Sequence, residues 1–165
     1  MDWTVEFRAR VQTVRACGVV HVAERTRADL SRAAAGEVAI LGDPRSVADA
    51  LVRGLDFHTL GRGWRELTRT DAYAVLTAAL TRDLAYDAEL MDEGTARAFA
   101  DDFLGRFSVD AQFFTNGEFR PPPTGASGQA QRTAEWDPLT EATFDTGVAV
   151  VDVDRAGLLW FEDED

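Results

Sequence analysis

The sequence of 165 residues predicts a single α+β domain, 1–165, with a mixed or antiparallel sheet, a C-terminal β-hairpin and about four helices. Two long segments in the middle of the chain repeat apolar residues at helical spacing, which predicts amphipathic helices. Near the C-terminus, two β-rich runs flank a short polar turn, which predicts the hairpin. The hydrophobic share of 45% and the charged share of 28% are ordinary for a globular protein, so a folded core is expected.

The N-terminal segment is predicted to contain two strands. Residues 3–13 alternate apolar and polar side chains and include several Val and Thr, which favours a half-buried strand. Residues 19–22, which follow a glycine, predict a second short strand. The first segment also fits a helix, because four of its apolar residues fall at helical spacing: Trp3, Phe7, Val11 and Val14.

The next segment predicts two helices with a strand between them. Residues 24–36 are rich in Ala and Arg and end at a glycine, as helices often do. The apolar run 38–41 predicts a short strand. Asp43 and Pro44 form a helix-start signal, an acid at the N-cap followed by proline, and this helix is expected to end near Gly54.

The middle of the chain carries the clearest helical patterns. Residues 57–64 contain two glycines and predict a loop. Residues 70–90 predict the strongest helix, capped by Thr70 or Asp71, with apolar residues three and four positions apart. Residues 95–107 predict a further helix, whose stripe of small and large apolar residues suits packing against the preceding helix.

The C-terminal third predicts β-structure interrupted by a loop. Residues 112–114 predict a short strand that leads into a tight turn at 115–117, since Asn-Gly favours such turns. Residues 120–133, RPPPTGASGQAQRT, cannot build a core and predict an exposed loop. Residues 147–161 predict a hairpin whose turn lies at 154–157.

The net charge of −12 belongs entirely to the second half of the chain, and all 17 basic residues are arginine. Residues 1–82 hold 12 Arg and 10 acids, whereas residues 83–165 hold 5 Arg and 19 acids. Binding to nucleic acid requires a basic surface, and docking on an anionic membrane does too, so neither is expected. A basic protein is the charged partner that this composition favours.

Cysteine content and hydropathy indicate the cellular compartment of the protein. The single cysteine, Cys17, excludes an internal disulfide and a cysteine-based zinc site, and it is expected to be inert. The N-terminus lacks a signal-peptide pattern, and the apolar runs are far shorter than the ~20 residues of a membrane span. The sequence therefore predicts a cytoplasmic protein, and no cofactor and no metal ligand are assigned.

Candidate catalytic groups are few. His58 lies in the loop 57–64, a better place for a catalytic group than the predicted strand that holds His21. No Gly-x-Ser-x-Gly nucleophile motif occurs, and Gly61 and Gly63 lack the third glycine of a nucleotide-binding loop. No catalytic residue is assigned. An enzyme that uses His58 or His21 with a carboxylate, with or without a metal, is one alternative function.

Carboxylates gather around the predicted hairpin. Asp152 and Asp154 lie at its turn, while Asp145 and the acidic tail 162–165 lie at its open end. Such acids could hold a divalent cation, although the EF-hand spacing is absent. They could also form a solvated surface that aids solubility. The third interpretation is a site for a basic partner, which long-range attraction would steer into place.

Two tryptophans lie beside these acids in the sequence. Trp136 follows the loop 120–133, and Trp160 precedes the acidic tail. A tryptophan with charged neighbours is typical of a binding hot spot, and core packing is the alternative. The predicted partner-binding set is Asp145, Asp152, Asp154, Trp136, Trp160, Glu162, Asp163, Glu164 and Asp165.

The segment 136–147, WDPLTEATFDTG, with the hairpin and the acidic end WFEDED, resembles the C-terminal part of small acidic bacterial proteins. Proteins of this kind act as immunity proteins or antitoxins in polymorphic toxin systems. The resemblance covers about the last 50 residues, including Phe114 to Gly117, and is one of size and acidity. It implies a stoichiometric inhibitor that covers the active site of a basic toxin, often a nuclease.

An acidic cytoplasmic binding protein, and more narrowly an immunity protein for a basic toxin, is therefore the leading hypothesis. Besides the enzyme described above, the remaining alternative is a structural or scaffold subunit of a larger assembly. In that case the exposed loop 120–133 would supply the contact.

Overall fold

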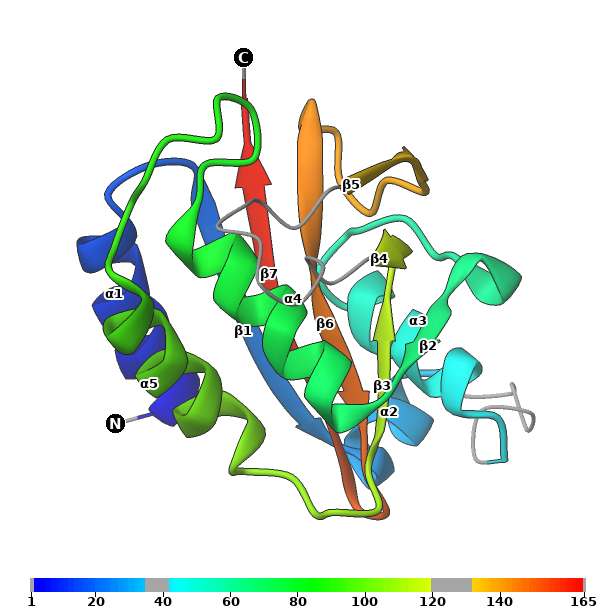
Figure 1. The fold of residues 1–165 in the computed structure, drawn as a ribbon. Coiled ribbons are helices and arrows are strands. Elements are labelled where there is room, and N and C mark those ends of the chain that lie inside the picture. Colours follow the sequence, from blue (N-terminus) through cyan, green and yellow to red (C-terminus); the bar gives the residue numbers. More distant parts are fainter. Residues whose placement is uncertain (1, 35–41, 120–131, 165) are drawn as a thin grey trace.

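The structure is a computed structural model that describes residues 2–34, 42–119 and 132–164. Its centre is a five-stranded sheet with the order β1-β7-β6-β3-β2, in which every neighbouring pair is antiparallel (Figure 1). This arrangement confirms the predicted α+β class. The strands are β1 (Val19–Thr26), β2 (Arg65–Leu67), β3 (Gln112–Thr115), β6 (Phe144–Val151) and β7 (Arg155–Asp163).

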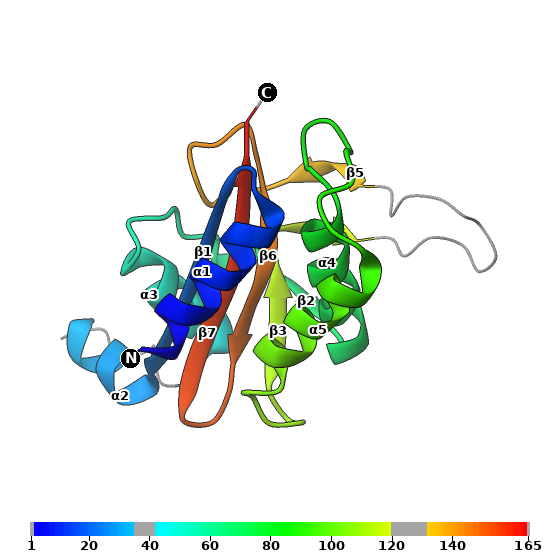
Figure 2. The ribbon, with the colours of Figure 1, turned by 90° about the vertical axis from the view of Figure 1, so that its left-hand side faces the viewer.

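Helices cover both faces of the sheet, so the elements form three layers (Figure 2). Helices α1, α4 and α5 pack on one face, and α2 and α3 pack on the other. Five α-helices are thus found in the described part of the chain, where about four were predicted. They are α1 (Trp3–Arg15), α2 (Arg27–Ala33), α3 (Pro44–Arg53), α4 (Arg69–Thr81) and α5 (Glu93–Leu104).

The strands of the C-terminal hairpin contribute to both apolar cores, because successive side chains of a strand point to opposite faces. Leu159 and Phe161 of β7 belong to the core under α1, α4 and α5, whereas Leu158 and Trp160 belong to the core under α3. All four side chains are fully buried. Burial on both faces explains why β7 reads as an almost unbroken apolar run.

The strand predicted for residues 3–13 is wrong, because these residues form helix α1. Asp2 caps the helix with its carboxylate. Phe7 and Val11 are fully buried, whereas Val5 is 58% exposed. Burial therefore follows the helical spacing rather than the alternation, because the segment packs its stripe on the sheet instead of joining it.

Two further helix predictions differ from the structure at their ends. The helix predicted for residues 24–36 begins at Arg27, because β1 continues to Thr26, whose side chain caps α2. The helix predicted for residues 70–90 is shorter: α4 ends at Thr81. Beyond that residue the polypeptide turns back on itself, and an isolated antiparallel bridge joins Arg82 to Glu89.

The remaining helix predictions are close to the structure. Helix α3 begins at Pro44 with Asp43 as its N-cap, as predicted. Helix α5 corresponds to the predicted helix 95–107. It begins two residues earlier, because Asp92 caps it. The loop predicted for 57–64 is irregular except for one turn of 3₁₀ helix, Gly61–Gly63, and β2 begins directly after the loop.

The predicted C-terminal hairpin is confirmed as β6 and β7. Val151 pairs with Ala156, so the turn lies at 152–155, two residues earlier than the predicted turn 154–157. The backbone N–H of Asp152 donates to the carbonyl oxygen of Arg155 at 2.8 Å and closes the turn.

The tight turn predicted at 115–117 is wrong. The chain only bends there and continues from β3 into β4 (Gly117–Phe119), which pairs with β5 (Arg132–Trp136) in a separate two-stranded sheet. Asn116 at the bend is buried, and its amide donates to Asp145 Oδ1 at 2.7 Å. This tertiary contact, rather than a reverse turn, sets the local conformation.

Two predictions concern residues beyond the described part of the chain. The predicted strand 38–41 and residues 120–131 of the predicted loop 120–133 lie outside the described residues. Residues 132–133 of that predicted loop are instead the first residues of β5.

Strand β1 lies at one edge of the five-stranded sheet, next to α1. The outward backbone groups of Val20 are occupied by side chains of that helix. Gln12 Oε1 accepts from the Val20 N–H at 2.8 Å, and Arg8 Nε donates to the Val20 carbonyl at 3.0 Å. Helix α1 therefore covers part of the sheet edge as well as one face.

Candidate functional site

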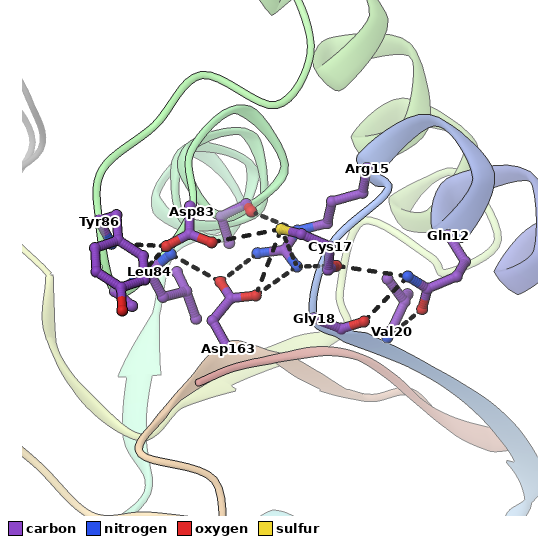
Figure 3. A network of polar contacts seen from close by, with 11 residues as sticks. Gln12, Arg15, Cys17, Gly18, Val20, Asp83, Leu84, Tyr86 and Asp163 are labelled. Carbon is purple, nitrogen blue, oxygen red and sulfur yellow. Dashed lines mark hydrogen bonds and ion pairs between the residues drawn. The ribbon is translucent and has the colours of Figure 1, made fainter. Parts of the chain in front are cut away.

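A buried ion pair lies where α1, α4 and β7 end close together (Figure 3). Arg15 donates two hydrogen bonds to Asp163, at 2.8 Å from Nη1 and 2.6 Å from Nη2. Both side chains are almost completely buried. The Arg15 guanidinium also lies 5.1 Å from the ring centre of Phe161. A bidentate pair in this setting is strong, because the low-dielectric interior screens it little.

The same two side chains also bind backbone groups from other elements. Arg15 donates to the carbonyl oxygens of Ala79 and Cys17, at 3.3 and 3.0 Å. Asp163 accepts the N–H of Leu84 at 2.7 Å. The pair therefore joins the end of α1, the end of α4 and the last residue of β7, which are far apart in the sequence.

Cys17 and Asp83 complete this cluster. The Cys17 thiol donates to Asp83 Oδ2 at 3.4 Å. Burial raises the pKa of the Cys17 thiol to about 11, and the nearby carboxylates add to that effect. Burial alone would raise the pKa of Asp83 too, but the backbone N–H groups of Tyr86 and Ala85 outweigh it and lower that pKa.

Ligand atoms of Cys17, Asp83 and Asp163 all lie within 4.8 Å of one another, a grouping that fits a metal ion by distance. The two carboxylates already accept hydrogen bonds from protein donors, however. Asp163 binds Arg15 through both oxygens, and Asp83 caps the turn that follows α4. A cation would have to displace a buried guanidinium, so the geometry favours a structural role for the cluster.

The raised pKa of Cys17 predicts slow thiol chemistry. At pH 8 we expect the folded protein to react with a disulfide reagent such as DTNB ~100-fold more slowly than the urea-unfolded chain, because only the thiolate attacks. Asp83→Asn should speed the reaction, since the Asp83 carboxylate raises the pKa of Cys17. Glu66→Gln, on β2 at the opposite edge of the sheet, is the control. Equal rates for folded and unfolded protein would contradict the raised pKa of the Cys17 thiol.

A second buried carboxylate, Asp145 of β6, binds the loop that precedes this strand. Asp145 is 2% exposed and accepts the backbone N–H groups of Leu139 and Thr140, at 2.8 and 2.7 Å. The amide of Asn116 supplies a third hydrogen bond. Burial raises the pKa of Asp145 above its ordinary value, and the hydrogen bonds from Thr140 and Leu139 only partly offset it. This carboxylate therefore has an internal structural function.

Both histidines lie within hydrogen-bond reach of a carboxylate, which the enzyme hypothesis requires. His21 Nε2 is 2.6 Å from Glu162 Oε1, and His58 Nε2 is 2.7 Å from Glu141 Oε1. The two members of the second pair are largely exposed. A shallow cleft of about 340 Å³ between α4 and α5 is lined by other residues, among them Tyr73. Neither histidine pair lines that cleft.

The structure separates the predicted partner-binding residues into buried and exposed groups. Asp145, Asp152, Trp160 and Asp163 are buried, so their prediction as surface contacts is wrong. Trp160 packs edge-on against Trp64 in the core, with centroids 6.1 Å apart. Trp136 is half-buried and stacks on Phe144.

The predicted acidic tail 162–165 is also largely part of the fold. Glu162 and Asp163 are the last residues paired in β7, with internal partners in His21 and Arg15. Glu164 accepts a hydrogen bond from the Thr143 hydroxyl at 2.8 Å. Asp165 lies outside the described residues.

Asp152 and Asp154 do lie at the hairpin turn, as predicted, but they differ in role. Asp154 is exposed and pairs with its neighbour Arg155. Asp152 is buried and binds the loop that follows α5, accepting from Ser108 N at 2.6 Å and from Ser108 Oγ at 2.7 Å. Burial alone would raise the pKa of Asp152, but these donors lower it.

Six of the eleven exposed acids in the described part of residues 83–165 lie on α5 and its flanks, which the sequence prediction missed. Arg97 is the one exposed arginine between residues 89 and 110. Arg97 pairs with Glu93 on the helix, and Arg10 of α1 pairs with Asp102. The exposed acids in this stretch, here called the α5 acidic surface, are Glu89, Asp92, Glu93, Asp101, Asp102 and Asp110.

Comparison of the chain with protein-family models, with curated proteins and with solved structures returns no significant match. Among the described residues, none of the helices combines the length and apolar character needed to cross a bilayer.

Proposed function

We propose that this protein is an acidic binding protein that neutralises a basic protein partner, and that it serves as an immunity protein against a basic toxin. The observation that carries the proposal is the α5 acidic surface. It presents six exposed carboxylates and one exposed arginine between residues 89 and 110. A surface of this kind attracts a basic protein over a distance of about one Debye length, ~8–10 Å.

The fold holds this surface rigidly, which favours binding. Helix α5 buries Phe99 and Phe103 in the core, where both rings contact Phe7 of α1, while its acids face solvent. Arg69 of α4 donates to the carbonyl oxygen of Leu104 at 2.7 Å and thereby ties down the end of the helix. A rigid helix loses little backbone entropy when a partner docks on it.

Three of these acids neither cap a helix nor have an ion-pair partner within the described residues, and they give the sharpest test: Glu89, Asp101 and Asp110. The triple variant Glu89→Gln, Asp101→Asn, Asp110→Asn should keep the fold but slow association with the partner ~10-fold at low salt, with a weaker dependence on ionic strength. The partner to be tested first is the product of the neighbouring reading frame, whose toxicity co-expression should suppress.

The matched control removes the same charge from other surfaces. Glu6, Asp56 and Glu66 are exposed and lie outside the α5 acidic surface. Neutralising these three should change the association rate less than about twofold. An equal effect of both triple variants would show that only the net charge matters, and a neighbouring product that is acidic or that does not bind would contradict the proposed function.

A further inference from the structure

The two most exposed large apolar residues in the described part of the chain lie in neighbouring turns. Val109 is 84% exposed and Val153 is 82% exposed. Each stands beside one member of the Asp152–Ser108 contact, which joins the hairpin turn to the loop after α5. Figures 1 and 2 both show this loop and the β6–β7 turn at the same end of the molecule.

Each of the two turns spans four residues and is closed by one backbone hydrogen bond, which runs in opposite directions in the two turns. The N–H of Ala111 donates to the Ser108 carbonyl at 3.2 Å and closes the turn Ser108-Val109-Asp110-Ala111. In the turn Asp152-Val153-Asp154-Arg155 the N–H of the first residue, Asp152, instead donates to the carbonyl oxygen of the last, Arg155, at 2.8 Å. Each turn therefore displays a Val-Asp pair at its two central positions.

Neither the local backbone nor the core explains a valine at these positions. Turn positions favour Pro, Gly, Asn, Asp and Ser, and a β-branched side chain gains nothing there. At more than 80% exposure these valines also gain little from burial. A single exposed apolar residue is normal on a protein surface, but two of them in turns that the Asp152–Ser108 contact joins point to an apolar interaction site.

Several contacts hold the two turns in fixed positions. The backbone N–H of Arg27 donates to the Asp154 carbonyl at 2.8 Å. Glu24 of β1 binds Arg106 at 2.6 Å and Arg155 at 3.2 Å, so it connects both turns through their flanking residues. The valines are therefore presented on a preorganised surface, which lowers the entropy lost on binding.

We propose that Val109 and Val153 form the apolar centre of the surface that docks the basic partner, with Asp110 and Asp154 as its charged rim. This inference rests on the proposed function and names the place of contact. The occupant is a basic protein because Asp110 belongs to the α5 acidic surface and both turns carry an exposed aspartate beside the valine. An apolar centre with a charged rim is the usual anatomy of a binding hot spot.

The test is site-specific photocrosslinking of the full chain in the cells that produce it. The photoreactive amino acid p-benzoylphenylalanine replaces Val109, Val153, Asp101 or Val5 in separate variants. Val5 is the matched control, because it is an exposed valine on α1. We expect a basic protein to be crosslinked from positions 109 and 153 and not from position 5. The captured protein is then purified, and its affinity for uncrosslinked variants is measured.

The double variant Val109→Ser, Val153→Ser should bind that protein ~30-fold more weakly while its thermal stability stays unchanged, because serine suits a turn. Val5→Ser should leave the affinity unchanged. Unchanged binding of the double variant, or crosslinking of a second copy of this chain, would overturn the docking surface. Capture of a basic protein from position 101 alone would retain the proposed function and reject this surface, and capture of no basic protein from any position would reject both.

Discussion

Replacing Asp163 with asparagine is expected to lower the free energy of unfolding by about 3–5 kcal/mol, because it leaves the buried Arg15 guanidinium without a counter-charge. Urea-induced unfolding followed by circular dichroism measures this change, and it should also lower the Tm by ~6–20 °C. The fold itself should survive, since asparagine can still accept the N–H of Leu84 through its carbonyl oxygen.

Two further variants separate the ion pair from other effects of the substitution. Arg15→Met combined with Asp163→Asn should be more stable than Asp163→Asn alone, because no uncompensated charge remains. Asp102→Asn breaks an exposed pair with Arg10 and should change stability by less than about 1 kcal/mol. Similar losses for Asp163→Asn and Asp102→Asn would refute a special role for the buried pair.

Gly18→Ala is expected to destabilise the protein by about 3–5 kcal/mol, as much as the loss of Asp163, because it combines backbone strain with the loss of a buried pair. Gly18 has φ of +58°, a conformation that costs an L-residue roughly 1–2 kcal/mol. A Cβ atom there would also overlap Asp163 Oδ1 and the Glu162 carbonyl oxygen. The carboxylate would have to leave Arg15, so the substitution breaks the ion pair by steric means. Chemical unfolding of the purified variant measures the effect.

The chain offers a matched control for this substitution. A methyl group at Gly42 would meet no atom of the described residues within 4 Å, so Gly42→Ala should change stability by less than about 1 kcal/mol. The two largest effects should also be non-additive, because Gly18→Ala and Asp163→Asn disrupt the same pair. Additive losses in the double variant would show that the glycine acts independently of the ion pair.

The elements that local chemistry determines were predictable from the sequence. Asp43 and Pro44 mark the start of α3, and the apolar runs of β6 and β7 predict the hairpin. Residues 3–13 were ambiguous, because their apolar residues fit both the helical and the strand period. Only packing against the sheet, which buries Phe7 and Val11 together, decides for the helix.

The acidic residues were harder to place, because a carboxylate in the sequence gives no sign of where its hydrogen-bond donors lie. Asp163 belongs to the predicted acidic tail, yet its partner Arg15 is 148 residues away. Asp145 binds two backbone N–H groups five and six residues before it, and also a side-chain amide 29 residues before it. Asp152 likewise binds Ser108, in a distant loop. The sequence therefore predicts an acidic second half, but several of the carboxylates that it assigns to the surface are buried and bind groups inside the fold.

The valines at the two turns had a signal in the sequence that composition and charge do not reveal. Each follows a turn-favouring residue and precedes an aspartate, in Ser108-Val109-Asp110 and Asp152-Val153-Asp154. A β-branched residue within such a polar triplet departs from turn preferences. Their proximity, however, depends on the contact between Asp152 and Ser108, which no local pattern contains.

The side chains of α1 that bind the edge of β1 restrict the addition of a further strand to this sheet. An exposed edge strand is a template for another strand, whether from a partner or from an aggregating copy of the same chain. Gln12 and Arg8 already occupy the outward N–H and carbonyl groups of Val20, so an incoming strand cannot continue the ladder through that residue without displacing them. Recognition by strand addition is thus blocked at this position, and Gln12→Ala with Arg8→Ala would reopen a route to edge-to-edge polymerisation.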